Sequence, residues 1–470
     1  MFENKTVKEL IFLIKNREIS IKDLNKYYLE KINNINPKLN AIVSLKDENE
    51  ILDEAEKKDE QKDKSSMLFG LPIAIKDLSD VSGLPTTYGY KGTKNYLPKK
   101  NSLFVDRLIN KGVIIIGKTN TAELGVGGHT INRLFGPTSN VYDLSKSAAG
   151  SSGGASSAVA AGMLPFADGT DQMGSCRGPA AFANIYGFRP TPGLIPADRS
   201  GHDKKLPILT TPGCFGRTPD DMSYFLDTVV GKHKNDPLSF NVEGKFYDYE
   251  LNDNEFSKTK ICWLSDMDNR YELENGIEDM CNKKLKELEK NNLSIVSPDI
   301  KINVDYLWES WICLRSKSIY NDTLAMNIKN IDDMTEQAIW EYNKGSKIKD
   351  DDIDIAMKQK LDCFNQVGKL FDKFDFLALP SAQIFPFDKK IQYPSELNNK
   401  KLDTYHRWLE IFVMSSLLEL PTVSIPIGFN KNGYPMGIQI IGKKGDDLKV
   451  FSFAKKYEEV FNYSKTKPRF

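Results

Sequence analysis

Apolar residues near the start of the chain recur at the spacing of one helix face. The residues that follow this i, i+3, i+4, i+7 pattern are Val7, Leu10, Ile11 and Ile14. Ser20, with Asp23 three residues later, resembles a capping box and predicts a second helix that runs through Leu29. We therefore expect a helical hairpin that leads into the short apolar run AIVSL at residues 41–45.

Helices and short apolar runs alternate after this hairpin. The predicted elements are a charged helix near residues 46–62, a strand at 71–75, a helix at 102–111 and a strand at 113–116. Further strand-like runs lie at 376–379, 422–429 and 436–442. Because alternation of this kind is typical of helices that cover a sheet, we predict an α/β fold with a single large mixed β-sheet core flanked by helices.

The middle of the chain differs in composition from both ends. Residues 233–257 are polar, acidic and poor in periodicity, which predicts a long surface connection. From about residue 260 to 372 the pattern is mostly that of charged amphipathic helices. We expect one domain over 1–470 that consists of an N-terminal part (1–232), a variable, mainly helical insertion (233–372) and a C-terminal part that completes the sheet (373–470).

Positive and negative charges balance, since 64 Lys and Arg stand against 64 Asp and Glu. This balance shows no electrostatic footprint for nucleic acid or for an anionic membrane, so we expect a small-molecule partner. No apolar run reaches the length of a signal peptide or a membrane span, which predicts a cytoplasmic protein. The six cysteines form no CxxC pair, and we expect no disulfide framework, no metal and no cofactor.

The stretch GTDQMGSCRGPA, residues 169–180, contains the first candidate for chemistry. Its glycines predict a loop, and this loop carries Ser175 between Gly174 and Cys176. A serine is a poor nucleophile unless a base takes its proton, and the usual base is histidine. The chain has four histidines, namely His129, His202, His233 and His406.

Two other motifs match known patterns in a context that does not fit them. Residues 112–119 satisfy the phosphate-loop pattern GxxxxGK[ST], but the β-branched run at 113–116 predicts a buried strand instead. Residues 150–154 satisfy the GxSxG elbow with Ser152 as nucleophile. That elbow needs a buried strand directly before it and a downstream histidine, and only His406 has a plausible position.

The stretch from Ser147 to Pro190 forms one unit with glycine-flanked serines on both sides of a small-residue helix at 155–163. Spacing alone leaves two interpretations open. The serines either belong to turns around a closely packed helix, or the glycine-rich loops direct free N–H groups at a negative oxygen.

Taken together, these motifs resemble the amidase signature family, whose pattern reads roughly GGSSGG, a small-residue helix and then G[ST]DxGGSxRxPA. The resemblance extends to GLPIAIKD at 70–77, VIIIGKTNTAELG at 113–125, ELPTVSIPIGF at 419–429 and GYPMGIQIIG at 433–442. It covers nearly the whole chain except about 233–372. The resemblance implies the amidase signature fold over the whole chain and hydrolysis of carboxylic amides to an acid and ammonia or an amine.

Carried over residue by residue, the resemblance implies a Ser-Ser-Lys triad of Lys76, Ser151 and Ser175. The intervals of 75 and 24 residues between them fit the family, whereas Ser152 would shift both by one. It also implies a cis peptide between Gly150 and Ser151. A lysine base must be neutral, and burial at the end of an apolar strand would lower the pKa of Lys76 from about 10.4. Lys76 would then deprotonate Ser151, and Ser151 would deprotonate Ser175, which forms the acyl-enzyme.

The backbone N–H groups of Gln172, Met173, Gly174 and Ser175 are the expected oxyanion donors. The segment 123–128, which includes Gly125, is expected to border the substrate. Met173 stands where the family usually has glycine, so either the loop tolerates a side chain there or the oxyanion geometry differs. A third interpretation is that Met173 lines the acyl pocket. We interpret Cys176 as a packing residue.

Two further expectations concern other side chains. Asp171 and Arg177 are expected to form a structural pair or loop-to-backbone bonds and not to act as catalysts. The aromatic residues of the predicted insertion could shape the substrate pocket or could be ordinary core residues; they are Tyr306, Trp308, Trp311 and Tyr320.

Two alternatives to a stand-alone amidase remain. The first is the glutaminase A subunit of a tRNA-dependent amidotransferase, which usually carries an aspartate where this chain has Leu409 beside Glu410. That difference and Met173 favour the stand-alone enzyme, for which a homodimer stays open. The second alternative is a catalytically silent binding protein on the amidase scaffold.

Overall fold

The computed structural model describes residues 2–3, 5–199, 202–299 and 301–470. The strands are β1 (Pro72–Lys76), β2 (Ile114–Thr119), β3 (Phe166–Asp171), β4 (Tyr186–Arg189), β5 (Thr211–Gly216), β6 (Lys260–Trp263), β7 (Ser294–Val296), β8 (Phe376–Pro380), β9 (Glu396–Leu397), β10 (Lys400–Lys401), β11 (Thr422–Phe429) and β12 (Pro435–Ile441). The α-helices are α1 (Val7–Lys15), α2 (Ile21–Leu39), α3 (Glu48–Asp59), α4 (Leu103–Asn110), α5 (Gly153–Ala160), α6 (Arg177–Ala183), α7 (Pro219–Val229), α8 (Asp253–Ser257), α9 (Ile277–Glu289), α10 (Val304–Ala325), α11 (Glu336–Gly345), α12 (Asp350–Phe371), α13 (Val413–Leu417) and α14 (Asp447–Phe461).

Within the described residues, eight strands form one mixed sheet in the order β3-β5-β4-β11-β12-β8-β6-β7. Neighbours from β3 to β8 pair antiparallel, and β6 pairs parallel with both β8 and β7. All residues of β12 are buried, as expected for a strand covered on both faces. The predicted large mixed sheet is confirmed, and three of its predicted runs, now β8, β11 and β12, lie next to one another in it.

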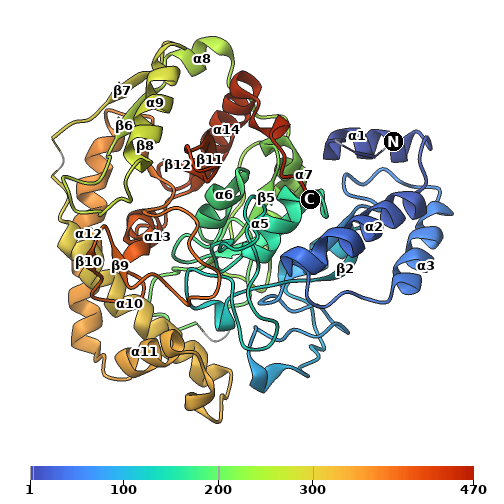
Figure 1. Cartoon of the computed structure of the whole chain (residues 1–470), viewed down its shortest axis with the longest axis horizontal. Coiled ribbons are helices and arrows are strands. Elements are labelled where there is room, and N and C mark those ends of the chain that lie inside the picture. Colours follow the sequence, from blue (N-terminus) through green and yellow to red (C-terminus); the bar gives the residue numbers. More distant parts are fainter. Residues whose placement is uncertain (1, 4, 200–201, 300) are drawn as a thin grey trace.

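Helices cover both faces of this sheet (Figure 1). On β4, a side chain at Gly187 would meet Cys176 and Ala180 at the start of α6, whereas the ring of Phe188 packs on Phe451 of α14. Successive strand residues point to opposite faces, so α6 and α14 lie on opposite sides of the sheet. Glycine at position 187 lets α6 approach the strand closely.

The N-terminal hairpin forms as predicted. Thr6 and Glu9 close a capping box at α1, and the four apolar residues that predicted this helix are buried. Ser20 caps α2 by accepting the N–H of Asp23, although the reciprocal bond of a full box is not formed. Helix α2 continues ten residues beyond Leu29 to Leu39, because the apolar face continues through Ile32 and Ile35.

Strands β1 and β2 differ from the prediction of a single sheet, because they form a separate parallel pair. This pair lies beside the edge strand β3, and the backbone N–H of Lys76 donates to the Asp168 carboxylate of β3 at 2.9 Å. The Asp168 side chain therefore accepts the hydrogen bond that a backbone carbonyl of β3 would accept in a continuous sheet.

Most of the residues between 233 and 372 are helical, with α10, α11 and α12 packed on one another at one end of the molecule (Figure 1). Strands β6 and β7 also lie in this segment and join the sheet. The stretch 233–257 is more than a surface connection, because Phe246 is fully buried against Phe188 and Phe451.

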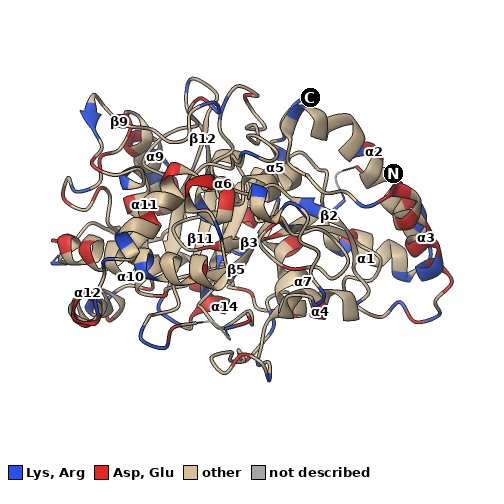
Figure 2. Ribbon diagram, turned by 90° about the horizontal axis from the view of Figure 1, so that it is seen from below, with Lys and Arg blue, Asp and Glu red and all other residues tan. Residues whose placement is uncertain are grey.

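Charged residues of both signs are interspersed on the outer helices, for example on α3 and α12 (Figure 2). In the parts of the chain that the structure describes, no helix has both the length and the apolar character needed to cross a bilayer.

Candidate active site

Strand β1 delivers Lys76 into the interior of the protein. Its residues 72–76 are all buried, and Lys76 is 0% exposed. The bond from its own N–H to Asp168 fixes the end of the strand, so the lysine side chain starts from a rigid position. Burial lowers the pKa of Lys76 to about 8, which makes a substantial neutral fraction available near neutral pH.

Three hydroxyl groups surround the Lys76 amine. Its Nζ lies 2.8 Å from Ser151 Oγ, 2.6 Å from Ser152 Oγ and 2.7 Å from Thr170 Oγ1. An ammonium group can donate to all three, whereas a neutral amine keeps two donors and one lone pair. In the neutral state one hydroxyl must therefore turn its proton toward Nζ, which is the arrangement a proton transfer from Ser151 needs.

Ser151 follows Gly150, and any larger residue at position 150 would displace the backbone of residues 129 and 130. The Gly150–Ser151 peptide is cis, as the resemblance implies. A Cβ at Gly150 would lie 2.6 Å from the carbonyl carbon of His129 and 2.8 Å from the nitrogen of Thr130. Ser151 itself is 2% exposed, and its main chain is tied down because Ala122 N–H and the Thr130 hydroxyl both donate to its carbonyl.

Ser175 lies in the turn between β3 and α6, so the stretch 169–180 is not the continuous loop that its glycines predict. It begins as the end of β3 and ends within α6. Gly174 has a φ of +83°, and a Cβ there would lie 2.4 Å from the Phe412 ring. Ser175 is 7% exposed, and among the described residues no hydrogen bond joins it to Ser151.

The carboxylate of Asp171 organises this turn. It accepts the N–H groups of Gly174 and Cys176, both at 3.0 Å, on either side of Ser175. It also pairs with Arg177 at 2.8 Å and Arg189 at 3.3 Å, and all three charged side chains are fully buried. Burial alone would raise the pKa of Asp171, but the two guanidinium groups hold it well below its usual range. The predicted Asp171–Arg177 pair is thus confirmed.

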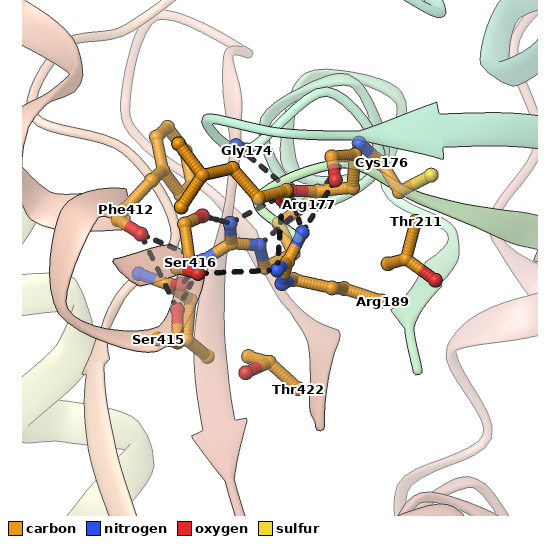
Figure 3. Close-up of polar contacts among 12 residues, drawn as sticks. Gly174, Cys176, Arg177, Arg189, Thr211, Phe412, Ser415, Ser416 and Thr422 are labelled. Atoms are coloured by element: carbon orange, nitrogen blue, oxygen red, sulfur yellow. Dashed lines mark hydrogen bonds and ion pairs between the residues drawn. The ribbon is translucent and has the colours of Figure 1, made fainter. Parts of the chain in front are cut away.

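Arg177 connects the turn to the far end of the chain. Its guanidinium donates to Ser415 Oγ at 2.5 Å, Ser416 Oγ at 2.7 Å and Gln439 Oε1 at 2.7 Å (Figure 3). Residues from α13 and β12 therefore help to position the serine loop.

The structure distinguishes the four N–H groups expected to bind an oxyanion. That of Gly174 already donates to Asp171. Those of Gln172, Met173 and Ser175 have no hydrogen-bond partner among the described residues. Three donors consequently remain available beside the Ser175 hydroxyl, and a methionine at position 173 does not remove one.

A narrow pocket with a cavity volume of about 10 Å³ lies beside Ser175. It is lined by Gly125, Gly127, Gln172, Met173, Ser175, Arg315, Tyr405, His406 and Leu409. Met173, at 5% exposure, borders the pocket beside the serine, and the Gly125 region lies close to Ser151. Cys176 is fully buried, with its sulfur packed against Gly169 and Gly213, which agrees with a packing role.

Aromatic residues from 306 to 320 do not line this pocket. Trp311 is fully buried, and Trp308 packs behind His406 with ring centroids 5.1 Å apart. Helix α10 contributes Arg315 instead. Leu409 borders the pocket, while Glu410 is held in ion pairs with Arg270 and Arg407.

The alternative motifs take other positions. Residues 114–119 form strand β2, and the Lys118 side chain is fully buried and donates to the Ser79 carbonyl, so no phosphate loop is present there. Ser152 is buried beside Lys76 and has no strand directly before it. None of the described histidines forms a hydrogen bond with Ser151, Ser152 or Ser175.

Four residues of the site were missed from the sequence. Asp168 and Thr170 lie on β3, whose glycine-containing sequence does not read as a strand. Arg315 and Tyr405 lie in polar stretches where a charged or hydroxyl-bearing side chain normally faces solvent. Asp168 and Thr170 are two residues apart, on either side of Gly169, and this period of two could have indicated strand β3.

The chain is similar to known proteins over nearly its whole length. A family model described as Amidase matches residues 23–451. The A subunit of the glutamyl-tRNA(Gln) amidotransferase of a Sulfurihydrogenibium species is 30% identical, and the match covers 99% of both chains. An acylamidase of Rhodococcus erythropolis is 29% identical over 98% of this chain and 96% of its own. The crystal structure of a bacterial aryl acylamidase of the amidase signature family superposes with a TM-score of 0.88 at 25% identity, over 98% of both chains.

We predict that Asp171→Asn destabilises the fold by about 3–5 kcal/mol, because it leaves two buried guanidinium groups without their anion. Urea unfolding followed by fluorescence measures the loss. Asp350→Asn is the matched control, because the exposed Asp350–Lys205 pair contributes little. A loss below about 1 kcal/mol for Asp171→Asn would contradict the role given to this carboxylate.

Proposed function

Because the chain belongs to the amidase signature family, we propose that Lys76, Ser151 and Ser175 carry out its amide hydrolysis through a seryl acyl-enzyme. The protein is an amide hydrolase, and its substrates are amides. The observation that supports the assignment is the contact of the fully buried Lys76 amine with Ser151 Oγ at 2.8 Å.

The proposed reaction begins with neutral Lys76. It accepts the proton of Ser151 as Ser151 accepts that of Ser175, and Ser175 Oγ attacks the carbonyl carbon. No hydrogen bond joins Ser151 to Ser175 among the described residues, and we expect this contact to form in the complex with substrate, as catalytic contacts commonly do. The free N–H groups of Gln172, Met173 and Ser175 then receive the negative oxygen.

Collapse of the tetrahedral intermediate breaks the C–N bond. The proton returns from Lys76 through Ser151 to the leaving nitrogen, so the amine departs neutral. A water molecule then attacks the ester of Ser175, and its proton follows the same route to Lys76. Lys76 then returns this proton through Ser151 to Ser175 as the ester C–O bond breaks and the acid is released, so all groups recover their starting protonation states.

A fluorophosphonate probe tests the nucleophile. We expect covalent labelling of Ser175, loss of labelling in Ser175→Ala, and persistence of the Ser175 adduct in Ser152→Ala, each measured by mass spectrometry of the digested protein. An adduct on Ser152 would revive the GxSxG elbow. No labelling at any pH up to about 9, where a lysine of lowered pKa is largely neutral, would refute the hydrolase mechanism.

The pH profile tests the base. Burial depresses the pKa of Lys76 to about 8 and the neutral form is the active one, so kcat/KM should rise with pH up to about 8 and level off above it. Lys76→Ala should lower kcat/KM at pH 7 by about 10²–10⁴-fold, with a residual rate that climbs toward high pH.

Lys118→Met is the matched control for this experiment. Lys118 lies on the neighbouring strand β2, is equally buried, and burial also lowers its pKa to about 8. Its amine contacts the Ser79 carbonyl, the Thr86 hydroxyl and, at 4.0 Å, the Asp77 carboxylate, but no serine of the site. Lys118→Met is therefore made together with Asp77→Asn, so that no buried anion is left unpaired. If the rise near pH 8 disappeared in this double variant and remained in Lys76→Ala, the assignment of the base would be wrong.

The A subunit of an amidotransferase is the second candidate, because relatives of that name are up to 30% identical to this chain. A stand-alone amidase is favoured, since Leu409 borders the pocket and the neighbouring Glu410 is already paired with two arginines. As a stand-alone enzyme, monomeric or homodimeric, it needs no nucleic acid. We expect negligible release of ammonia from glutamine by the purified chain, with or without partner subunits. Glutaminase activity that appears only with those subunits would favour the amidotransferase.

A further inference from the structure

A buried polar cluster adjoins the Ser175 pocket. It consists of Arg315 from α10, Glu341 from α11, and Tyr405 and His406 from the segment after β10, and we call it the Arg315 cluster. Arg315 forms an ion pair with Glu341 and donates to the Tyr405 hydroxyl at 2.9 Å. The Tyr405 hydroxyl donates to Glu341 at 2.6 Å. Three of these residues border the pocket, and Glu341 lies behind them.

The cluster has unused hydrogen-bonding capacity. Arg315 is 4% exposed and its Nε has no hydrogen-bond partner. His406 is fully buried, and neither of its ring nitrogens has a hydrogen-bond partner, although Nε2 lies 4.0 Å from Glu341 Oε1. Buried polar atoms are nearly always satisfied, because an unpaired one destabilises a protein by about 1–3 kcal/mol. Unsatisfied groups beside a nucleophile indicate that the partner arrives with the substrate.

We propose that the Arg315 cluster determines substrate specificity by binding an uncharged polar group, such as a second carboxamide, next to the amide that Ser175 attacks. This inference rests on the proposed function and names its substrate class. The guanidinium would donate to the carbonyl oxygen of that second group, and the adjacent imidazole would complete its hydrogen bonding.

The charges of the pocket favour an uncharged group. Arg315 is the one cationic side chain among the described residues that line the pocket, and Glu341 already neutralises it. A substrate carboxylate would place a second anion beside a single buried cation, and its desolvation would outweigh the attraction. Burial, together with the cations of Arg315 and Arg407, holds the pKa of His406 well below its usual range, so its ring is neutral.

The donor pattern favours a carboxamide in particular. A neutral imidazole carries one N–H donor and one acceptor nitrogen, and a guanidinium carries only donors. A carboxamide offers an oxygen that accepts from Arg315 and an N–H that can donate to His406. Met173 and Leu409 supply apolar lining beside these polar groups, against which the methylene chain between the two amides would lie once the narrow pocket widens around a substrate.

Three matched probes test the proposal: hexanamide, pentanediamide and 5-amino-5-oxopentanoate, with shorter members of each series alongside. Released ammonia gives kcat and KM for each. We expect the best diamide to exceed the alkanamide of equal length by about tenfold in kcat/KM, mainly through KM, as one buried hydrogen bond can supply. The anionic amide should be the poorest of the three.

The variant for this test removes both charges, because Arg315→Met alone would leave Glu341 buried and unpaired. In Arg315→Met/Glu341→Gln we expect the preference for the diamide to fall to within about threefold. Arg199→Met/Asp236→Asn is the matched control, since it removes an equally buried ion pair that lies outside the pocket. The control should keep the diamide preference of the parent enzyme.

The outcomes separate this inference from the proposed function. Hydrolysis of hexanamide and the diamide at equal kcat/KM, with Ser175 still labelled by a fluorophosphonate, would overturn the inference and leave the function standing. A preference for the anionic amide would overturn the choice of an uncharged group. If the Arg199→Met/Asp236→Asn control also lost the preference for the diamide, the loss would reflect a general change in the fold, and the inference would be overturned. Absence of both turnover and labelling would overturn both proposals.

Discussion

The geometry of the site depends on one buried carboxylate. Asp171 receives two backbone N–H groups that flank Ser175 and two guanidinium groups that come from α6 and β4. A carboxylate with this many donors stays ionised, and each bond fixes the position of one more piece of backbone. The serine is thereby held at the end of β3 by electrostatics, whereas the three unoccupied N–H groups beside it stay free because Asp171 uses only those of Gly174 and Cys176.

A second constraint concerns the balance of charge around Lys76. Complete burial disfavours its ammonium form, while the nearby carboxylates of Asp168 and Asp171 oppose the shift. The resulting pKa of Lys76 is about 8, so the side chain is neither permanently charged nor permanently neutral in this pH range. The surrounding hydroxyls of Ser151, Ser152 and Thr170 can donate or accept, so they satisfy the amine in both protonation states.

Much of this architecture could be predicted from local pattern. The hairpin of α1 and α2 and the strands β1, β8, β11 and β12 carry apolar residues at regular spacing, and each is found near its predicted place. Strands β3 and β5 could not be predicted, because FADGTD and TPGCFG contain the glycines that allow helices and neighbouring strands to approach closely. Here tertiary packing overrides a local preference for turns.

Some residues of the candidate site could likewise be predicted from the sequence, and others could not. Lys76, Ser151 and Ser175 lie in motifs that the resemblance to the amidase signature family singles out, and the structure brings Lys76 and Ser151 into contact. Arg315 could not be predicted, because an arginine in a charged helix normally faces water and only the packing of α11 makes it a buried residue.

The order of the site residues along the chain has a consequence for synthesis of the protein. The groups proposed for chemistry all lie before residue 176, but Arg177 is completed by Ser415, Ser416 and Gln439. Since a ribosome makes the chain from the N-terminus, the growing polypeptide carries its reactive serine and lysine long before the residues that shape their loop exist. The loop that carries Ser175 therefore reaches its full set of hydrogen bonds only when synthesis is nearly finished.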